Sequence, residues 1–187
     1  SLAARIRDRL TAEDFTSSVL LTCNSLTGGT GNGMSPVVSR WLKDDVGFVS
    51  DLSLNLSILP SQSEIREAHY PRSALAGLHA TLSGEPSAGG IVDTVIVADN
   101  DSLARYGSAT GGNYRVFNEM LRDMIAPLLM ASMGRYSVPE LSSTLDLADI
   151  KRWIRSRAGF GPPEISTIGY ATMPVKAFEA GRFASAN

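Results

Sequence analysis

Segments with the character of buried β-strands alternate with segments of helical periodicity, and this alternation constrains the fold more than any other feature of the chain. Residues 17–23 form a continuous apolar run typical of a strand buried on both faces of a parallel sheet. Further strands are predicted at 52–59, 91–98 and 165–173, and helices at 2–12, 72–83, 101–106, 113–133 and 148–157. Strands that alternate with helices predict an α/β fold with a mostly parallel sheet.

The segment 113–133 is the longest predicted helix. Its apolar residues recur three and four positions apart: Phe117, Met120, Leu121, Met124, Ile125 and Leu128. A face this broad predicts a helix deep in the core. Pro127 is expected to kink this helix or to mark its effective end.

Composition excludes several classes of protein. The 187 residues are 43% hydrophobic and 19% charged, which predicts one globular domain rather than a disordered chain. A net charge of −2 without basic clusters argues against a nucleic-acid partner. No signal peptide or membrane-spanning run is evident, so we expect a cytoplasmic protein without a direct membrane partner.

Cysteine and histidine usage argues against a metal centre. The single cysteine, Cys23, cannot form a disulfide within the chain, and its apolar neighbours predict a buried side chain. His69 and His79 are not spaced as metal ligands. No protein-held metal site is therefore expected.

A polar, glycine-rich segment at 24–33 follows the first strand and precedes a helix, which we expect to begin at Ser35 and Pro36. A strand, a glycine loop and a helix N-terminus together form an anion-binding arrangement. The glycines do not fit the dinucleotide pattern Gly-x-Gly-x-x-Gly or the Walker loop. The alternative is a tight turn that packs the helix onto the sheet, although four glycines in six residues exceed that need.

This segment resembles the glycine-rich phosphate loop of the tubulin/FtsZ superfamily, although Thr27 stands where the family usually has a further glycine. Other stretches follow in the family's order, so the resemblance covers roughly residues 1–175. It implies a Rossmann-like GTPase domain with a long central helix, which binds GTP or GDP with Mg²⁺. The loop residues implied to bind nucleotide are Gly28, Gly29, Thr30, Gly31, Asn32 and Gly33.

Four further residues are implied to bind the nucleotide. Glu64 ends the segment 60–64, which resembles the loop whose acidic residue meets the ribose. Asn100 lies in the segment 99–103, which resembles the family segment whose Asn reads the guanine or the ribose. Tyr114 matches a family aromatic whose ring stacks on guanine, and Asn118 matches a family Asn that hydrogen-bonds the edge of the guanine. Because they are four residues apart on a helix, they share one face.

Without the resemblance, each of these residues has a simpler interpretation. Tyr114 is then a half-buried core aromatic, and Asn118 is a solvent-facing helix residue. Asn100 is then part of an Asx turn.

The segment 146–149 resembles the family loop that inserts into the nucleotide site of the next subunit. The resemblance implies that Asp146 and Asp149 are catalytic and position the attacking water. Either residue could instead be an N-cap or a first-turn acid of the following helix. Thr144 stands where the family has an Asn, and residues 169–171 resemble the next strand.

The resemblance implies a self-assembling cytoskeletal GTPase that hydrolyses GTP between subunits of a head-to-tail filament. Tubulin-like and FtsZ-like details are mixed, which fits a divergent prokaryotic or phage member. We expect residues 1–133 to form part of the GTP-binding domain, and 134–187 to hold the catalytic loop, a helix and the start of the C-terminal domain. The family's first phosphate loop has no match, so an internal fragment is expected.

Two other classes of function stay open. One is a catalytically inactive tubulin-like scaffold or interaction module. The other is a small α/β oxidoreductase that uses the glycine loop for a dinucleotide, which the absence of Gly-x-Gly-x-x-Gly disfavours.

Overall fold

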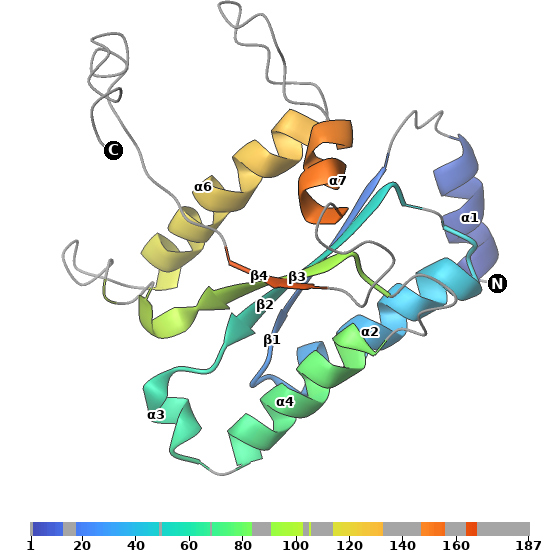
Figure 1. Cartoon of the computed structure of the whole chain (residues 1–187). Helices are drawn as coiled ribbons and strands as arrows, with labels where there is room; N and C mark the ends of the chain where they lie inside the picture. Colours follow the sequence, from blue (N-terminus) through green and yellow to red (C-terminus); the bar gives the residue numbers. More distant parts are fainter. Residues whose placement is uncertain are drawn as a thin grey trace, which may run out of the picture.

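A computed structural model of the chain describes residues 2–12, 18–48, 50–67, 69–83, 91–102, 105, 114–132, 147–155 and 164–167. Within these ranges helices alternate with strands (Figure 1). The elements are α1 Leu2–Ala12, β1 Val19–Ser25, α2 Gly29–Asp44, β2 Leu52–Leu59, α3 Gln62–Ile65, α4 His69–Leu82, β3 Thr94–Asp99, α6 Tyr114–Ser132, α7 Leu147–Arg155 and β4 Glu164–Ser166.

The four strands form one parallel sheet in the order β1-β2-β3-β4. Val19 pairs with Leu52 and Ser25 with Ile58, while Leu54 pairs with Thr94 and Leu59 with Asp99. The carboxyl ends of β1, β2 and β3 therefore lie along one edge of the sheet. The predicted parallel α/β fold is confirmed.

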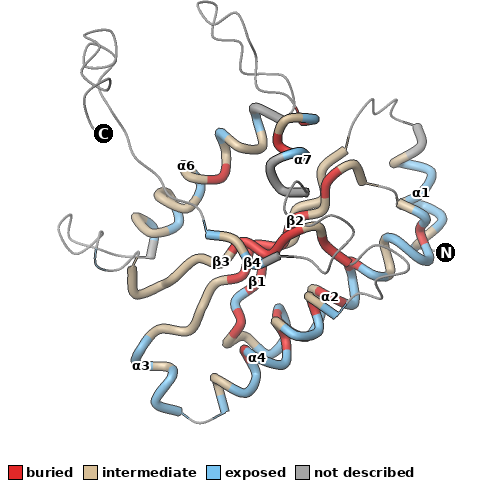
Figure 2. The backbone as a smooth tube through the Cα atoms, viewed as in Figure 1, coloured by how far each residue is buried: buried red, intermediate tan, exposed pale blue. Residues whose placement is uncertain are grey.

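The first face of the sheet is apolar and is covered by α6 and α7 (Figure 1). Alternate residues of β2 (Leu52, Leu54 and Leu56) form a buried cluster with Ile96 of β3, and Ile125, Leu147 and Ile150 pack against them. Figure 2 shows the most buried backbone running through the sheet, between helices whose outer sides are exposed. This two-sided covering explains why the strands are so apolar.

The opposite face, under α2 and α4, is partly polar. Asn55 of β2 is fully buried, and its amide nitrogen donates to Thr22 Oγ1 and Asn24 Oδ1 at 2.9 Å and to Ser35 Oγ at 3.2 Å. The Ser57 hydroxyl donates to Asn55 Oδ1 at 2.6 Å. Because Ser35 belongs to α2, this network fixes that helix to the sheet.

Most predicted elements are confirmed, with differences at their ends. β3 begins at Thr94 rather than at residue 91, although Ile91 and Val92 are buried with Val95 in a second cluster under α4. Pro127 does not end α6, which continues to Ser132. The described part of the last strand is residues 164–166.

The predicted start of α2 is wrong. The helix begins at Gly29, and the first helical hydrogen bond runs from the Asn32 N–H to the Gly28 carbonyl at 3.0 Å. Pro36 lies buried inside the helix, where its missing N–H costs one internal hydrogen bond. Packing against the sheet and α4 outweighs this loss, so the second half of the glycine segment, from Gly29 on, is helix rather than loop.

The predicted burial of Cys23 is also wrong, because this residue is exposed. It lies on β1, at the edge of the described sheet, where no further strand covers it. Nearby protein still raises the pKa of its thiol by desolvation, which argues against a reactive thiolate.

No described helix combines the length and apolarity needed to cross a membrane. No group of three or more His, Cys, Asp or Glu side chains among the described residues is arranged to hold a metal ion.

Candidate functional site at the carboxyl edge of the sheet

Three of the segments predicted to bind nucleotide lie at the carboxyl edge of the sheet. The glycine segment follows β1, the α3 turn with Glu64 follows β2, and Asn100 follows β3. Strand pairing places these ends side by side, since Ser25 pairs with Ile58 and Leu59 with Asp99. Ligands of parallel α/β sheets bind outside this edge.

The start of α2 offers main-chain donors. Gly28 is the N-cap residue and provides no side-chain cap. The N–H groups of Gly29, Thr30 and Gly31 precede the first helical hydrogen bond, so they have no acceptor within the helix. All three residues are exposed, and together with the helix dipole they can hold an anion.

The glycines of this first turn are not required by packing within the described chain. A Cβ at Gly29 or Gly33 would meet nothing within 4 Å, and one at Gly31 would make an ordinary 3.7 Å contact with Asn24. Glycine in a helix costs up to about 1 kcal/mol relative to alanine. Open space kept at this cost fits a ligand that approaches the backbone closely, as a phosphate group does.

Asn32 points away from this exposed surface. Its side chain is buried between α2 and α4, where Nδ2 donates to the Leu26 carbonyl at 3.1 Å and to the Ser73 carbonyl at 2.6 Å. A Cβ at Gly77 of α4 would lie 1.6 Å from Asn32 Oδ1. The side chain of this predicted nucleotide-binding residue therefore joins the two helices.

Glu64 closes a capping box at the start of α3, a short helix in the segment that the family resemblance predicts to be a loop. Its Oε2 accepts the Ser61 N–H at 2.8 Å and the Ser61 hydroxyl at 2.9 Å. The main-chain bond is the largest cause of a lowered Glu64 pKa; hydrogen bonding from the Ser61 and Thr27 hydroxyls lowers this pKa further. The motif Ser61-x-x-Glu64 is a recognisable helix start and would have revealed α3.

Asn100 lies in a turn held by its two acidic neighbours. Asp99 accepts the Asp101 N–H at 3.0 Å and the Ser102 hydroxyl, and its carboxylate lies 3.7 Å from Arg105. The Ser102 hydroxyl is the largest cause of a lowered Asp99 pKa. Asn100 is half-buried at the end of β3.

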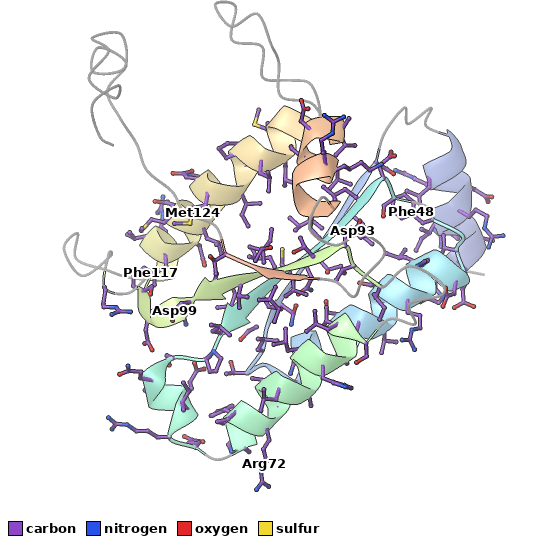
Figure 3. The ribbon with its side chains drawn as sticks, in the orientation of Figure 1. Phe48, Arg72, Asp93, Asp99, Phe117 and Met124 are labelled. Carbon is purple, nitrogen blue, oxygen red and sulfur yellow. The ribbon has the colours of Figure 1, made fainter. Side chains whose placement is uncertain are left out.

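The remaining predicted base-binding residues are on α6. Tyr114 begins this helix, and its side chain lies outside the described residues. Asn118 is one turn further along and is exposed. Figure 3 shows Phe117, from the same turn, and Asp99 at the same end of the sheet. The structure thus leaves Asn118 open to a ligand.

Asp149, one of the two predicted catalytic acids, belongs to a different part of the molecule. Asp146 lies outside the described residues, and Asp149 is half-buried in the first turn of α7. Lys151 of the same helix forms a 2.9 Å ion pair with Asp51, the residue before β2. This ion pair places α7 near the amino edge of the sheet. Since β2 spans roughly 25 Å, that edge is far from the glycine turn.

Comparison with known proteins identifies the family. The family model described as Tubulin/FtsZ family, GTPase domain, matches residues 1–108. The chain belongs to the Tubulin/FtsZ family. The matched residues contain β1, the glycine turn, α3 and the Asn100 turn.

Tubulin-like proteins are among the most similar relatives of this Tubulin/FtsZ chain. Tubulin-like protein CetZ3 of Haloferax volcanii is 29% identical over 153 residues, which cover 82% of this chain and 35% of CetZ3. CetZ1 of the same organism is 29% identical over 156 residues, covering 83% and 35%. The CetZ protein of Pyrococcus horikoshii is 28% identical over 147 residues, covering 77% and 34%.

A solved structure supports the fold. CetZ from Methanosaeta thermophila matches with a TM-score of 0.51 at 23% identity, covering 70% of this chain and 33% of that chain. The present chain spans about a third of the length of the curated relatives it matches.

Proposed function

We propose that this Tubulin/FtsZ chain provides the GTP site of a cytoplasmic, self-assembling cytoskeletal GTPase. The observation that carries the proposal is the separation of two groups of residues. The glycine turn, Glu64 and Asn100 lie at the carboxyl edge of the sheet, and Asp149 belongs to a helix tied to the amino edge. A second copy stacked head-to-tail would bring these two groups together.

In this proposal the chain's own residues hold GTP or GDP along the carboxyl edge. The N–H groups at Gly29, Thr30 and Gly31 bind the phosphates, and Gly28 and Gly33 keep the turn open. Glu64 and Asn100 contact the ribose or base from the neighbouring turns. Tyr114 stacks on guanine, and Asn118 hydrogen-bonds to its edge.

Asn32 takes a structural part in this site. Its buried side chain fixes the first turn of α2 against α4 and so holds the phosphate-binding donors in place. In this proposal Mg²⁺ is bound mainly through phosphate oxygens and water, since this ion usually takes only one or two protein carboxylates. When bound, Mg²⁺ would neutralise charge on the phosphates.

Asp146 and Asp149 act on the nucleotide of the adjacent subunit. The roughly 25 Å length of β2 argues against Asp149 reaching the nucleotide of its own chain. Asp149 would orient and polarise the attacking water. Hydrolysis then depends on assembly, and the head-to-tail contact repeats as an open filament because it does not close on itself.

The experiment combines GDP binding, GTP turnover and sedimentation after GTP addition, for the wild-type protein and for Asp149→Ala. The proposal expects pelleting with GTP, and it expects Asp149→Ala to keep GDP binding while turnover falls at least 100-fold. Loss of GDP binding in Asp149→Ala would contradict the separation of binding and catalysis.

An inactive tubulin-like scaffold is the second candidate. Thr27 in the usual glycine position and Thr144 in the place of an Asn favour it. A wild-type protein that binds no guanine nucleotide, with assembly unchanged by Asp149→Ala, would establish this alternative.

A further inference from the structure

One long-range hydrogen bond joins two of the turns at the carboxyl edge. A carboxylate oxygen of Asp101 accepts the main-chain N–H of Gln62 at 2.7 Å, between positions 39 residues apart. Gln62 is the first residue of α3, and Asp101 follows Asn100 directly. The bond therefore connects the Asn100 turn to the helix that carries Glu64.

Both sides of this bond are fixed by local contacts. On one side, the Asp101 N–H donates to Asp99 at 3.0 Å, and Asp99 also accepts from Ser102. On the other side, Ser61 and Glu64 close the capping box around Gln62. The bond joins two ordered units, so a shift of one is transmitted to the other.

We propose that Asp101 is a positioning residue for the nucleotide site, which holds the Asn100 turn at a fixed distance from α3 and Glu64. The inference rests on the proposed function, since it assumes that Asn100 and Glu64 meet the same nucleotide. Without Asp101 the two turns move independently, and the nucleotide must order them when it binds. That ordering lowers affinity without removing any direct contact.

The chain offers a matched control at the other end of the same strand pair. Asp93 precedes β3, and its carboxylate accepts the Ser53 N–H at 2.8 Å. This is the same kind of bond between the β2 and β3 segments, but at the amino edge. Figure 3 shows Asp93 and Asp99 at opposite ends of β3. Asp93→Ala should therefore disturb the fold without disturbing the site.

The test measures GDP binding by titration calorimetry for the wild-type protein, Asp101→Ala, Asp101→Asn and Asp93→Ala. Loss of a charge-assisted hydrogen bond predicts about tenfold weaker GDP binding in Asp101→Ala. Asp101→Asn keeps one neutral acceptor oxygen and should recover part of the affinity. Asp93→Ala should lower the melting temperature, because it removes a part-buried bond, and should leave the GDP affinity unchanged.

Amide hydrogen exchange supplies an independent readout. In Asp101→Ala the Gln62 N–H should exchange faster than in the wild-type protein and in Asp93→Ala. Equal GDP affinity in wild type and Asp101→Ala, or an equal affinity loss in both alanine variants, would overturn the positioning role and leave the proposed function standing. A wild-type protein that binds no GDP would overturn both.

Discussion

The Glu64 carboxylate accepts hydrogen bonds from the main-chain N–H and the hydroxyl of one residue, Ser61. These bonds favour the charged form and lower the pKa of Glu64. A group whose pKa is lower in the folded state stabilises the fold above its unfolded pKa. That contribution is complete above the ordinary pKa of a glutamate and is lost as the pH falls through the lowered folded value.

The cause of this shift can be tested directly. Ser61→Ala should raise the Glu64 pKa only part of the way to its ordinary value, because the main-chain donor, which is the larger cause, remains. The measurement is an NMR titration of the Glu64 carboxyl group. Ser63→Ala is the control. It removes a hydroxyl of the same turn, 2.9 Å from the Ser61 hydroxyl, and leaves both donors of Ser61 to Glu64 in place. Full recovery in Ser61→Ala would contradict the account.

Gly77 is required by its contact with Asn32. A Cβ at this position would lie 1.6 Å from Asn32 Oδ1, so the Asn side chain would have to leave its two carbonyl partners. We expect Gly77→Ala to destabilise the fold by about 2–3 kcal/mol in urea unfolding, although alanine favours helix. In an Asn32→Ala background the same change should cost little. An equal cost in both backgrounds would exclude this contact as the reason.

Helix α2 combines a poor helix-forming start with a well-packed body. Gly29 and Gly33 face open space, whereas Pro36 and Ser39 are buried. Gly29→Ala should therefore leave stability unchanged or raise it by up to about 1 kcal/mol. The added methyl group occupies the space assigned to phosphate, so GDP affinity should fall about tenfold or more. Melting temperature and GDP titration measure both effects.

Arg40→Ala, on the exposed side of the same helix, is the control for this experiment and should change neither quantity. If Gly29→Ala bound GDP as tightly as the wild-type protein, the glycine turn would not be the phosphate site.

An ion pair between Lys151 and Asp51, whose side chains are 27% and 39% exposed, adds to the apolar packing of helix α7 on the sheet. For a partly exposed pair, a double-mutant cycle with Lys151→Met and Asp51→Asn should give a coupling energy of about 0.5–1 kcal/mol. The coupling should shrink in 1 M salt because mobile ions screen the pair. Asp51→Asn alone should cost more than Lys151→Met, since Asp51 also accepts the Ser18 N–H at 3.0 Å.

At the scale of the molecule, periodicity was sufficient to predict the parallel α/β fold. The strand β2 and the helix α1 were predicted with their observed bounds, because continuous apolar runs and helical spacing are local signals. The start of α2 was not predictable in this way. Glycine and proline both argue against helix locally, and tertiary packing of α2 on the sheet and α4 decides the outcome.

The candidate site shows the same division between local and tertiary signals. Gly28 to Gly31, Glu64 and Asn100 could be singled out in the sequence, and strand register brings their segments to one edge. The Asn32 side chain points inward because it donates to the Ser73 carbonyl of α4, which is 41 residues away in the sequence. No local pattern encodes that contact. The exposed position of Cys23 likewise depends on which strand lies at the sheet edge.

The most direct test of catalysis between subunits mixes two variants of the whole protein. Asp149→Ala keeps the proposed nucleotide site and lacks the acid, whereas Asn118→Ala weakens the site and keeps the acid. Each variant alone should turn over GTP slowly, and an equimolar mixture should recover a substantial part of wild-type activity. The turnover of the wild-type protein per molecule should rise with protein concentration. A mixture no faster than the average of its parts, with wild-type turnover per molecule independent of concentration, would contradict hydrolysis at a subunit interface.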